Sequence, residues 1–298
     1  MLTGILAGLA AGALWGLVFV VPRMTPSLSA VDLTAGRFIS FGAVAVLAML
    51  LTAKSAKLPT LNQALAAAGM SILGYSGYYW LLAMSITDAG SEVPTLIIGI
   101  IPIWMMIWGK PETLRWRALL PGMLLTMVGL ALMTLASLHA MGTIAGDGAF
   151  WRGVVFACLA MVSWTIFGLM NAAWLHKHPE VSASTWTNWL GVATGAGALL
   201  LWLAAGSPAQ ALRALDNKAW LAFVCVATGI GSAWLATIFW NVASKRLSAS
   251  LCGQLIVAET IFGLIYSFLW DQSWPSGVQL AACVLFIAGI LASIRAHT

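Results

Sequence analysis

The chain has 298 residues, of which 61% are hydrophobic and only 8% are charged, and its mean hydropathy is +0.95. A soluble domain carries roughly 25% charged residues, so this composition excludes a soluble globular protein and predicts an integral membrane protein whose first partner is the lipid bilayer. The net charge of +5 comes without a basic run or a recognition motif, which argues against a nucleic-acid partner.

Ten apolar segments separated by short connections run through the whole chain. A membrane-crossing helix needs about 20 apolar residues. The segments cover residues 3 to 22, 32 to 51, 62 to 86, 91 to 108, 118 to 138, 149 to 175, 182 to 205, 219 to 243, 249 to 270 and 275 to 294. The expected fold class is therefore an all-α membrane protein with ten transmembrane helices.

Two residues of the first two segments are of interest for function. Trp15 lies in the middle of its segment, where the indole N–H needs a partner or water, so it is expected to line a cavity, with helix packing as the alternative. Arg37 lies a few residues inside the second segment. It could meet a substrate carboxylate, reach out to the lipid headgroups, or pair with Asp32 or Asp88.

The third segment holds three of the four tyrosines, Tyr75, Tyr78 and Tyr79, at spacings that place them on one helical face. Such a face could be the aromatic wall of a substrate cavity, with hydroxyl groups for hydrogen bonding. It could also belong to the belt of aromatic residues at the outer membrane interface. For Tyr78 and Tyr79 the cavity is the hypothesis that we carry forward.

The second half of the chain adds three candidates. Trp164 occupies a mid-segment position that matches Trp15, and it is expected to line the same cavity. In segment 219 to 243, Trp234 and Asn241 share a stripe at α-helical spacing. Because a stripe that carries an amide should not face lipid, both residues are expected to face the substrate.

Glu259 is the one carboxylate within the apolar run LCGQLIVAETIFGLIYSFLW of residues 251 to 270. A charge at the bilayer centre costs about 2.5–3.5 kcal/mol even on lenient insertion scales. Glu259 must therefore face protein or a wet cavity. It could bind the ammonium group of a substrate, carry a coupling proton, or be a structural acid bonded to a neighbouring helix.

The two halves of the chain resemble each other at two offsets. A shift of 149 residues superimposes Trp15 on Trp164, and a shift of 160 superimposes Gly129 on Gly289. Five segments per half is an odd number, so the halves would insert in opposite directions, as in many secondary transporters. The expected domains are two inverted five-helix repeats, residues 1–140 and 149–298, around a central cavity.

The distribution of Lys and Arg predicts that both termini are cytoplasmic. With the N-terminus inside, nine basic residues lie in cytoplasmic connections or the tail and four lie on the outer side. The inner ones are Lys54, Lys57, Lys110, Arg115, Arg117, Lys177, Lys245, Arg246 and Arg295, and the outer ones are Arg23, Arg152, Arg213 and Lys218.

Several motifs resemble the drug/metabolite transporter superfamily in its ten-span, EamA-like branch. They are ALWGLVFVVPR in the first segment, AGRFISFGAVAV in the second, the segment around Glu259, and small residues around Gly129 and Gly289. Within this branch the chain is most similar to the YddG-type exporters of amino acids. The resemblance implies a cavity built from spans 1 to 4 and 6 to 9, with spans 5 and 10 peripheral. It also implies export across the bacterial inner membrane by alternating access.

The expected function is export of amino acids, including aromatic and apolar ones, as the small-molecule substrate. The alternative is an exporter of lipophilic cations or other metabolites, in which Glu259 would bind the cation and the proton. An intramembrane enzyme would need paired carboxylates, a histidine cluster or a Ser/Lys couple within the spans, which the sequence lacks. No metal or other cofactor is expected, and a monomer is favoured.

Overall fold

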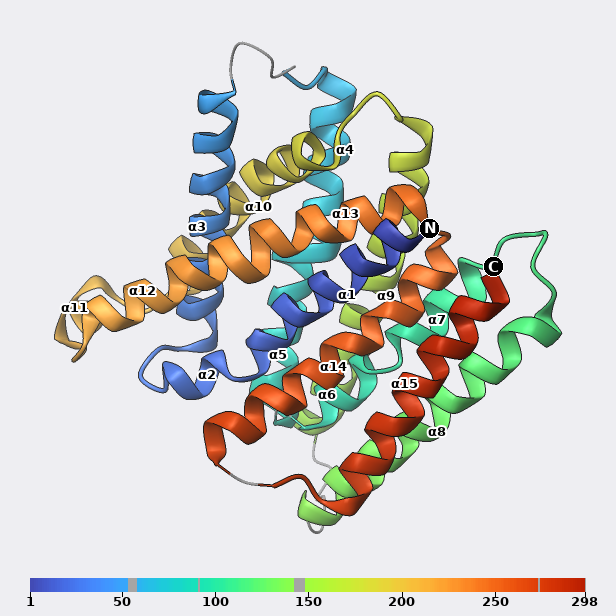
Figure 1. Cartoon of the computed structure of the whole chain (residues 1–298). Helices are drawn as coiled ribbons and strands as arrows, with labels where there is room; N and C mark the ends of the chain where they lie inside the picture. Colours follow the sequence, from blue (N-terminus) through green and yellow to red (C-terminus); the bar gives the residue numbers. More distant parts are fainter. Residues whose placement is uncertain (53–57, 91, 142–147, 273, 298) are drawn as a thin grey trace.

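The computed structural model describes residues 1–52, 58–90, 92–141, 148–272 and 274–297, and in these ranges the protein is helical without a strand (Figure 1). Eight helical segments among the described residues are long and apolar enough to cross a membrane. They are Leu2–Phe19, Ala30–Leu51, Trp116–Leu135, Gly148–Lys177, Ala183–Ala205, Lys218–Arg246, Ala249–Asp271 and Gly277–His297. The prediction of an all-α membrane protein is confirmed.

The first half of the chain forms helices α1 to α8. Their bounds are α1 Leu2–Gly16, η1 Leu17–Phe19, α2 Val21–Met24, α3 Ala30–Leu51, α4 Leu61–Ser71, η2 Ile72–Ser76, α5 Gly77–Ala89, α6 Glu92–Ile98, α7 Ile101–Trp108 and α8 Trp116–Met141. The segment η1 is a 3₁₀ turn and η2 is a π-helical turn.

The second half forms helices α9 to α15. Their bounds are α9 Gly148–Lys177, α10 Ala183–Ala205, α11 Ala209–Ala214, α12 Lys218–Thr228, η3 Gly229–Leu235, α13 Ala236–Arg246, α14 Ala249–Asp271 and α15 Gly277–His297. A second π-helical turn, η3, joins α12 to α13 without interrupting the helical path.

Two expected spans are not among the eight. Residues 62 to 86 correspond to α4, η2 and α5, which follow one another directly. Residues 91 to 108 are divided between α6 and α7, and Pro102 lies in the first turn of α7. Proline cannot donate a backbone hydrogen bond and disfavours α-helix just before it, which accounts for the break at residues 99 and 100. The number ten therefore stays a prediction.

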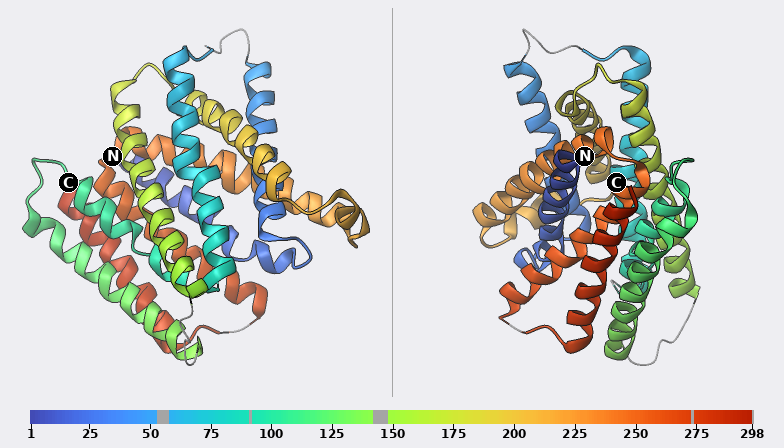
Figure 2. Two further views of the ribbon diagram at one scale, coloured as in Figure 1. Left: turned by 180° about the vertical axis from the view of Figure 1, so that it is seen from behind. Right: turned by 45° about the vertical axis from the view of Figure 1, so that its right-hand side comes forward.

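Helices far apart in the sequence pack in matching pairs. The closest neighbours are α3 with α10, α8 with α15, α1 with α13 and α14, and α9 with α5 and α6. The pair α8 and α15 lies at one edge of the molecule in Figure 1 and in the left view of Figure 2. The two termini lie near each other in all views, which agrees with placement of both ends on one side of the membrane. Their cytoplasmic orientation remains a prediction, and Lys54 and Lys57 lie outside the described residues.

Glycine allows the backbones of α3 and α10 to touch. A Cβ atom on Gly42 would lie 2.8 Å from the Cα atom of Gly195, and one on Gly195 would lie 2.8 Å from the Cα atom of Gly42. Any side chain at either position would push the helices apart. Small residues at such contacts are the usual means of helix packing in membranes, where burial of apolar surface drives association weakly.

A buried polar network joins α9, α10 and α13. The Asn171 amide donates to the Asn241 side-chain oxygen over 2.9 Å, and the Asn241 amide donates to the Thr187 hydroxyl over 2.9 Å. The Trp186 indole donates to the Asn171 side-chain oxygen over 2.7 Å. All four side chains are fully buried, so the network satisfies polar groups that could find no water in the bilayer.

We predict that Asn241→Ala destabilises the protein because it removes the acceptor of the buried Asn171 amide and one donor to the buried Thr187 hydroxyl. The expected loss is about 1–3 kcal/mol in the free energy of unfolding. The melting temperature of the purified protein in detergent measures it, with Asn62→Ala at an exposed position as the control. Equal melting temperatures for the two variants would contradict a structural role for the network.

Candidate functional site

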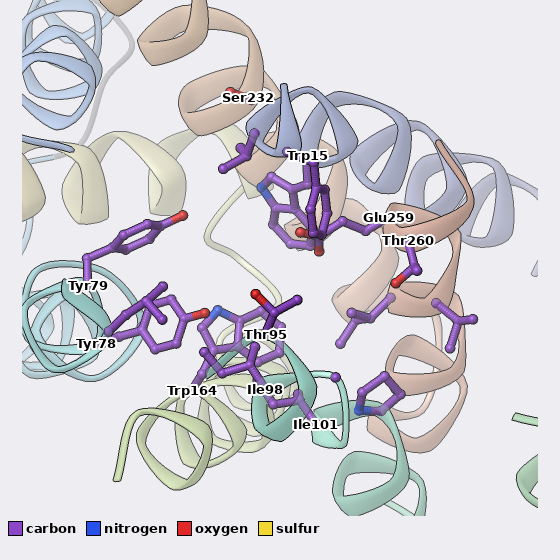
Figure 3. A pocket seen from close by; sticks show the side chains of 18 of the residues that line it. Trp15, Tyr78, Tyr79, Thr95, Ile98, Ile101, Trp164, Ser232, Glu259 and Thr260 are labelled. Carbon is purple, nitrogen blue, oxygen red and sulfur yellow. The ribbon is translucent and has the colours of Figure 1, made fainter. Parts of the chain in front are cut away.

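A cavity of about 310 Å³ lies among helices of both halves of the chain (Figure 3). Its lining residues come from α1, η1, α3, η2, α5, α6, α7, α8, α9, η3 and α14. Small-molecule sites in proteins are concave, largely apolar and about 300–1,000 Å³ in volume, so this cavity is of the right size and kind.

Three tryptophans close one end of the cavity. The ring centroids of Trp15 and Trp164 are 6.3 Å apart, and Trp240 lies 5.3 Å from Trp15 and 5.9 Å from Trp164. Trp15 and Trp164 line the cavity, whereas Trp240 is buried behind them. No residue of α1 before Trp15 reaches the cavity, so the tryptophan cluster separates it from the end of the molecule that holds the N-terminus.

All three tyrosines of the third segment line the cavity, and Tyr75 also makes a structural contact. The Tyr75 hydroxyl bonds to the Thr237 hydroxyl over 2.9 Å, which ties η2 to α13. Tyr78 and Tyr79 line the cavity, and Figure 3 shows their hydroxyl groups directed into it. Among the described residues neither hydroxyl has a hydrogen-bond partner, which leaves both free for a bound molecule.

Glu259 projects into the cavity from α14, beside Thr260 (Figure 3). Its side chain is half-buried. The structure shows no hydrogen bond and no ion pair between its carboxylate and any described residue. The hypothesis of a structural acid bonded to a neighbouring helix therefore finds no contact here, and the two hypotheses that involve substrate or proton remain.

Arg37 reaches the same cavity from α3 and is only 3% exposed. Its guanidinium donates one long hydrogen bond, 3.4 Å from Nη2 to the Ser232 hydroxyl oxygen, and its Nε has no partner. The guanidinium group also lies 5.9 Å from the centre of the Phe38 ring. Its burial excludes the expectation that it extends to the lipid headgroups.

The two acids considered as partners of this arginine are occupied elsewhere. Asp32 accepts hydrogen bonds from the Trp202 indole over 3.1 Å and from the Ser207 hydroxyl over 2.6 Å. Asp88 forms an ion pair with Arg152 through bonds of 2.7 and 2.8 Å. The guanidinium in the cavity is thus left without a carboxylate partner in the described part of the chain.

Trp234 and Asn241 lie outside the cavity, contrary to the sequence prediction. The Trp234 indole donates to the Asn188 side-chain oxygen of α10 over 2.8 Å, and Asn241 belongs to the buried polar network. The stripe was derived from α-helical spacing, but residues 229 to 235 form the π-helical turn η3, which changes the register. Ser232 and Ala233 of this turn face the cavity instead.

The set of helices around the cavity also differs from the one that the resemblance implied. Helix α8, the fifth expected span, contributes Leu130, Met133 and Thr134, whereas α10, the seventh, contributes none. The break between α6 and α7 accounts for the first difference, since Leu130 packs close to Gly99 at this break. Helix α10 is held away by its backbone contact with α3.

Sequence reasoning did not single out Phe38, Thr95, Phe167 and Ser232, all of which line the cavity. Phe38 follows Arg37 directly, and this position was the one feature of the sequence that could have indicated that Phe38 lines the cavity. Phe167 lies one helical turn after Trp164 and packs its ring 5.8 Å from it. Ser232 could not have been found, because it reaches the cavity only through the π-helical turn.

A comparison with protein families decides the class of the chain. The model of the EamA-like transporter family matches residues 2–135 and again residues 151–295. The chain belongs to the EamA-like transporter family. EamA proteins form part of the drug/metabolite transporter superfamily, as the sequence motifs indicated, so the chain is a multi-pass membrane transporter and not an enzyme.

Two relatives of this EamA protein and one solved structure cover nearly all of it. It is 29% identical over 309 residues to the inner membrane protein YtfF of Escherichia coli K12, covering 99% of this chain and 96% of that protein. It is 26% identical over 291 residues to the aromatic amino acid exporter YddG of Ancylobacter novellus, covering 95% of this chain and 94% of that protein. A crystal structure with 20% sequence identity has the same fold, with a TM-score of 0.79. The match covers 99% of this chain and 96% of that one.

We predict that water reaches position 260. In a variant whose only cysteine replaces Thr260, a small charged methanethiosulfonate should modify the thiol within minutes, because this side chain lines the cavity. A variant that retains only Cys252, fully buried on the same helix, is the matched control and should react only after denaturation. Reaction of Cys252 without reaction at position 260 would contradict the position of the cavity.

Proposed function

We propose that this EamA protein is a secondary transporter that exports amino acids, including aromatic and apolar ones, across the bacterial inner membrane. One observation carries the proposal: a single cavity combines aromatic walls with one arginine and one glutamate, neither of which forms an ion pair with any described residue. The names of the two relatives, an inner membrane protein and an aromatic amino acid exporter, agree with it.

The walls of the cavity suit an amphipathic substrate. Trp15, Trp164, Tyr78 and Tyr79 offer ring faces and edges to an apolar or aromatic group. The proposed substrate-binding residues are these four together with Glu259. An amino acid carries both the apolar group and the charges that such a cavity can accommodate.

Alternating access between two inverted repeats is the proposed mechanism, with residues 1–140 and 149–298 as the repeats. Helix α1 packs on α13 and α14, and α9, its counterpart at an offset of 149 residues, packs on α5, α6 and α7 in the reciprocal way. The π-helical turns η2 and η3 also fall at matching places, at an offset close to 160 residues. Such turns often occur at functional sites, and here they border the cavity.

The topology that we propose has ten spans and two cytoplasmic termini. In a cysteine-free variant, a single cysteine in place of exposed Glu112 should react with a membrane-impermeant maleimide only after the cells are opened. A cysteine in place of exposed Asp216 should react in intact cells, since it lies in an outer connection. The reverse labelling pattern would overturn the orientation.

The transport function predicts the effect of removing single rings. Tyr78→Ala and Trp164→Ala should each weaken amino-acid uptake into proteoliposomes about two- to tenfold, because each removes an aromatic contact of about 0.5–1.5 kcal/mol. Trp274→Ala, which removes a ring that is 95% exposed, is the control and should transport normally.

The same assay separates amino-acid export from its alternative. A panel of labelled amino acids is compared with a lipophilic cation such as tetraphenylphosphonium. Uptake of the cation without uptake of any amino acid would favour the exporter of lipophilic cations. Arg37 speaks against that alternative, because its buried positive charge in the same cavity opposes a ligand that carries a positive charge but no carboxylate.

A further inference from the structure

Two side chains of opposite charge face one cavity without pairing with each other. Arg37 enters from α3 and Glu259 from α14, and both line the cavity. The two ion pairs found among the described residues, Arg23 with Asp271 and Arg152 with Asp88, lie elsewhere. The cavity therefore presents a positive and a negative pole that are held apart on two helices.

Each pole has binding capacity that the protein leaves unused. A guanidinium has five N–H donors, and that of Arg37 makes one long hydrogen bond, to Ser232, while its Nε atom is buried without a partner. A carboxylate has about four acceptor positions, and that of Glu259 accepts nothing from the described residues. Charged groups shielded from bulk water are normally paired in proteins, so buried Arg37 and half-buried Glu259 can each take a partner from a bound molecule.

We infer that these two residues recognise the zwitterionic backbone of a free α-amino acid, Arg37 binding its carboxylate and Glu259 its ammonium group. The inference rests on the proposed function and names the part of the substrate that each pole holds. Arginine suits a carboxylate because its planar N–H groups match both oxygens. The ammonium group donates up to three hydrogen bonds, which a free carboxylate accepts.

If the backbone of the amino acid binds Arg37 and Glu259, its side chain can contact the aromatic residues of the cavity. In the view of Figure 3, Glu259 and Ser232, the hydrogen-bond partner of Arg37, flank Trp15, and Tyr78 and Tyr79 lie across the cavity. A backbone bound between the poles would direct its side chain toward these rings. Aromatic rings can contact many different apolar side chains, whereas Arg37 and Glu259 bind only a ligand that carries both a carboxylate and an ammonium group. The cavity thus selects for the backbone and tolerates different side chains.

The test compares three ligands that share one ring system: tryptophan, tryptamine, which lacks the carboxylate, and indole-3-propionate, which lacks the ammonium group. Each competes with tritiated tryptophan for the purified protein in detergent, which measures binding without transport. For the wild-type protein both analogues should compete at least about tenfold more weakly than tryptophan, because each leaves one of the two cavity charges unpaired.

Single substitutions should remove these differences in a crossed pattern. Glu259→Gln should abolish the preference for tryptophan over indole-3-propionate and keep the preference over tryptamine, because Arg37 still binds the carboxylate. Arg37→Gln should do the opposite. Asp271→Asn and Arg23→Gln, which remove the same groups from the ion pair outside the cavity, should leave both preferences unchanged.

The outcomes distinguish this inference from the proposed function. Amino-acid binding by the wild-type protein with an equal loss for all three ligands in Glu259→Gln would overturn the inference and leave the proposed function standing. Absence of binding or uptake of any amino acid by the wild-type protein would overturn the proposed function itself. If Arg37→Gln does not fold, Glu259→Gln alone tests the inference. It should lose the preference for tryptophan over indole-3-propionate and keep the preference for tryptophan over tryptamine.

Discussion

The hydrocarbon core of a bilayer offers no hydrogen bonds, and this constraint governs the whole structure. Every backbone group must be satisfied within a helix, and every ionisable side chain must leave the core, find a partner or face a cavity. Asp88 pairs with Arg152, and Asp32 accepts hydrogen bonds near the start of α3. Among the described residues Arg37 has no carboxylate partner and Glu259 has neither a hydrogen bond nor an ion pair, and both face the cavity. The position of the proposed site thus follows from the rule that excludes unpaired charge from lipid.

The same constraint determines how the helices are held together. Burial of apolar surface contributes little between helices that lipid already surrounds, so close packing and buried hydrogen bonds define the contacts. Gly42 and Gly195 bring two backbones into contact. At the opposite edge, Gln254 of α14 donates to Thr126 of α8 over 2.8 Å and accepts from Ser293 of α15 over 3.1 Å. These polar ties fix which helices are neighbours around the cavity.

The irregular backbone segments lie beside the cavity. The π-helical turns η2 and η3 and the break between α6 and α7 all border the cavity, through Gly74, Ser232 and Gly99. Non-helical backbone at membrane depth is tolerated only where protein or water can satisfy it. Each of these departures widens or interrupts a helix locally. This leaves space for the cavity and turns side chains such as Ser232 toward it.

The sequence by itself determined the membrane class, the family and the interest of Trp15, Tyr78, Tyr79, Trp164 and Glu259, because apolar length, repeated offsets and a lone intramembrane charge are visible in one dimension. It misplaced Trp234 and Asn241, because a stripe at α-helical spacing ignores the π-helical turn of residues 229 to 235, which contains Trp234. Only the tertiary structure showed that Arg37 lacks an acidic partner among the described residues, that Asp32 and Asp88 are bound elsewhere, and that α8 reaches the cavity. Those facts depend on contacts between helices distant in the sequence, and no local pattern records which polar groups such contacts leave unpaired.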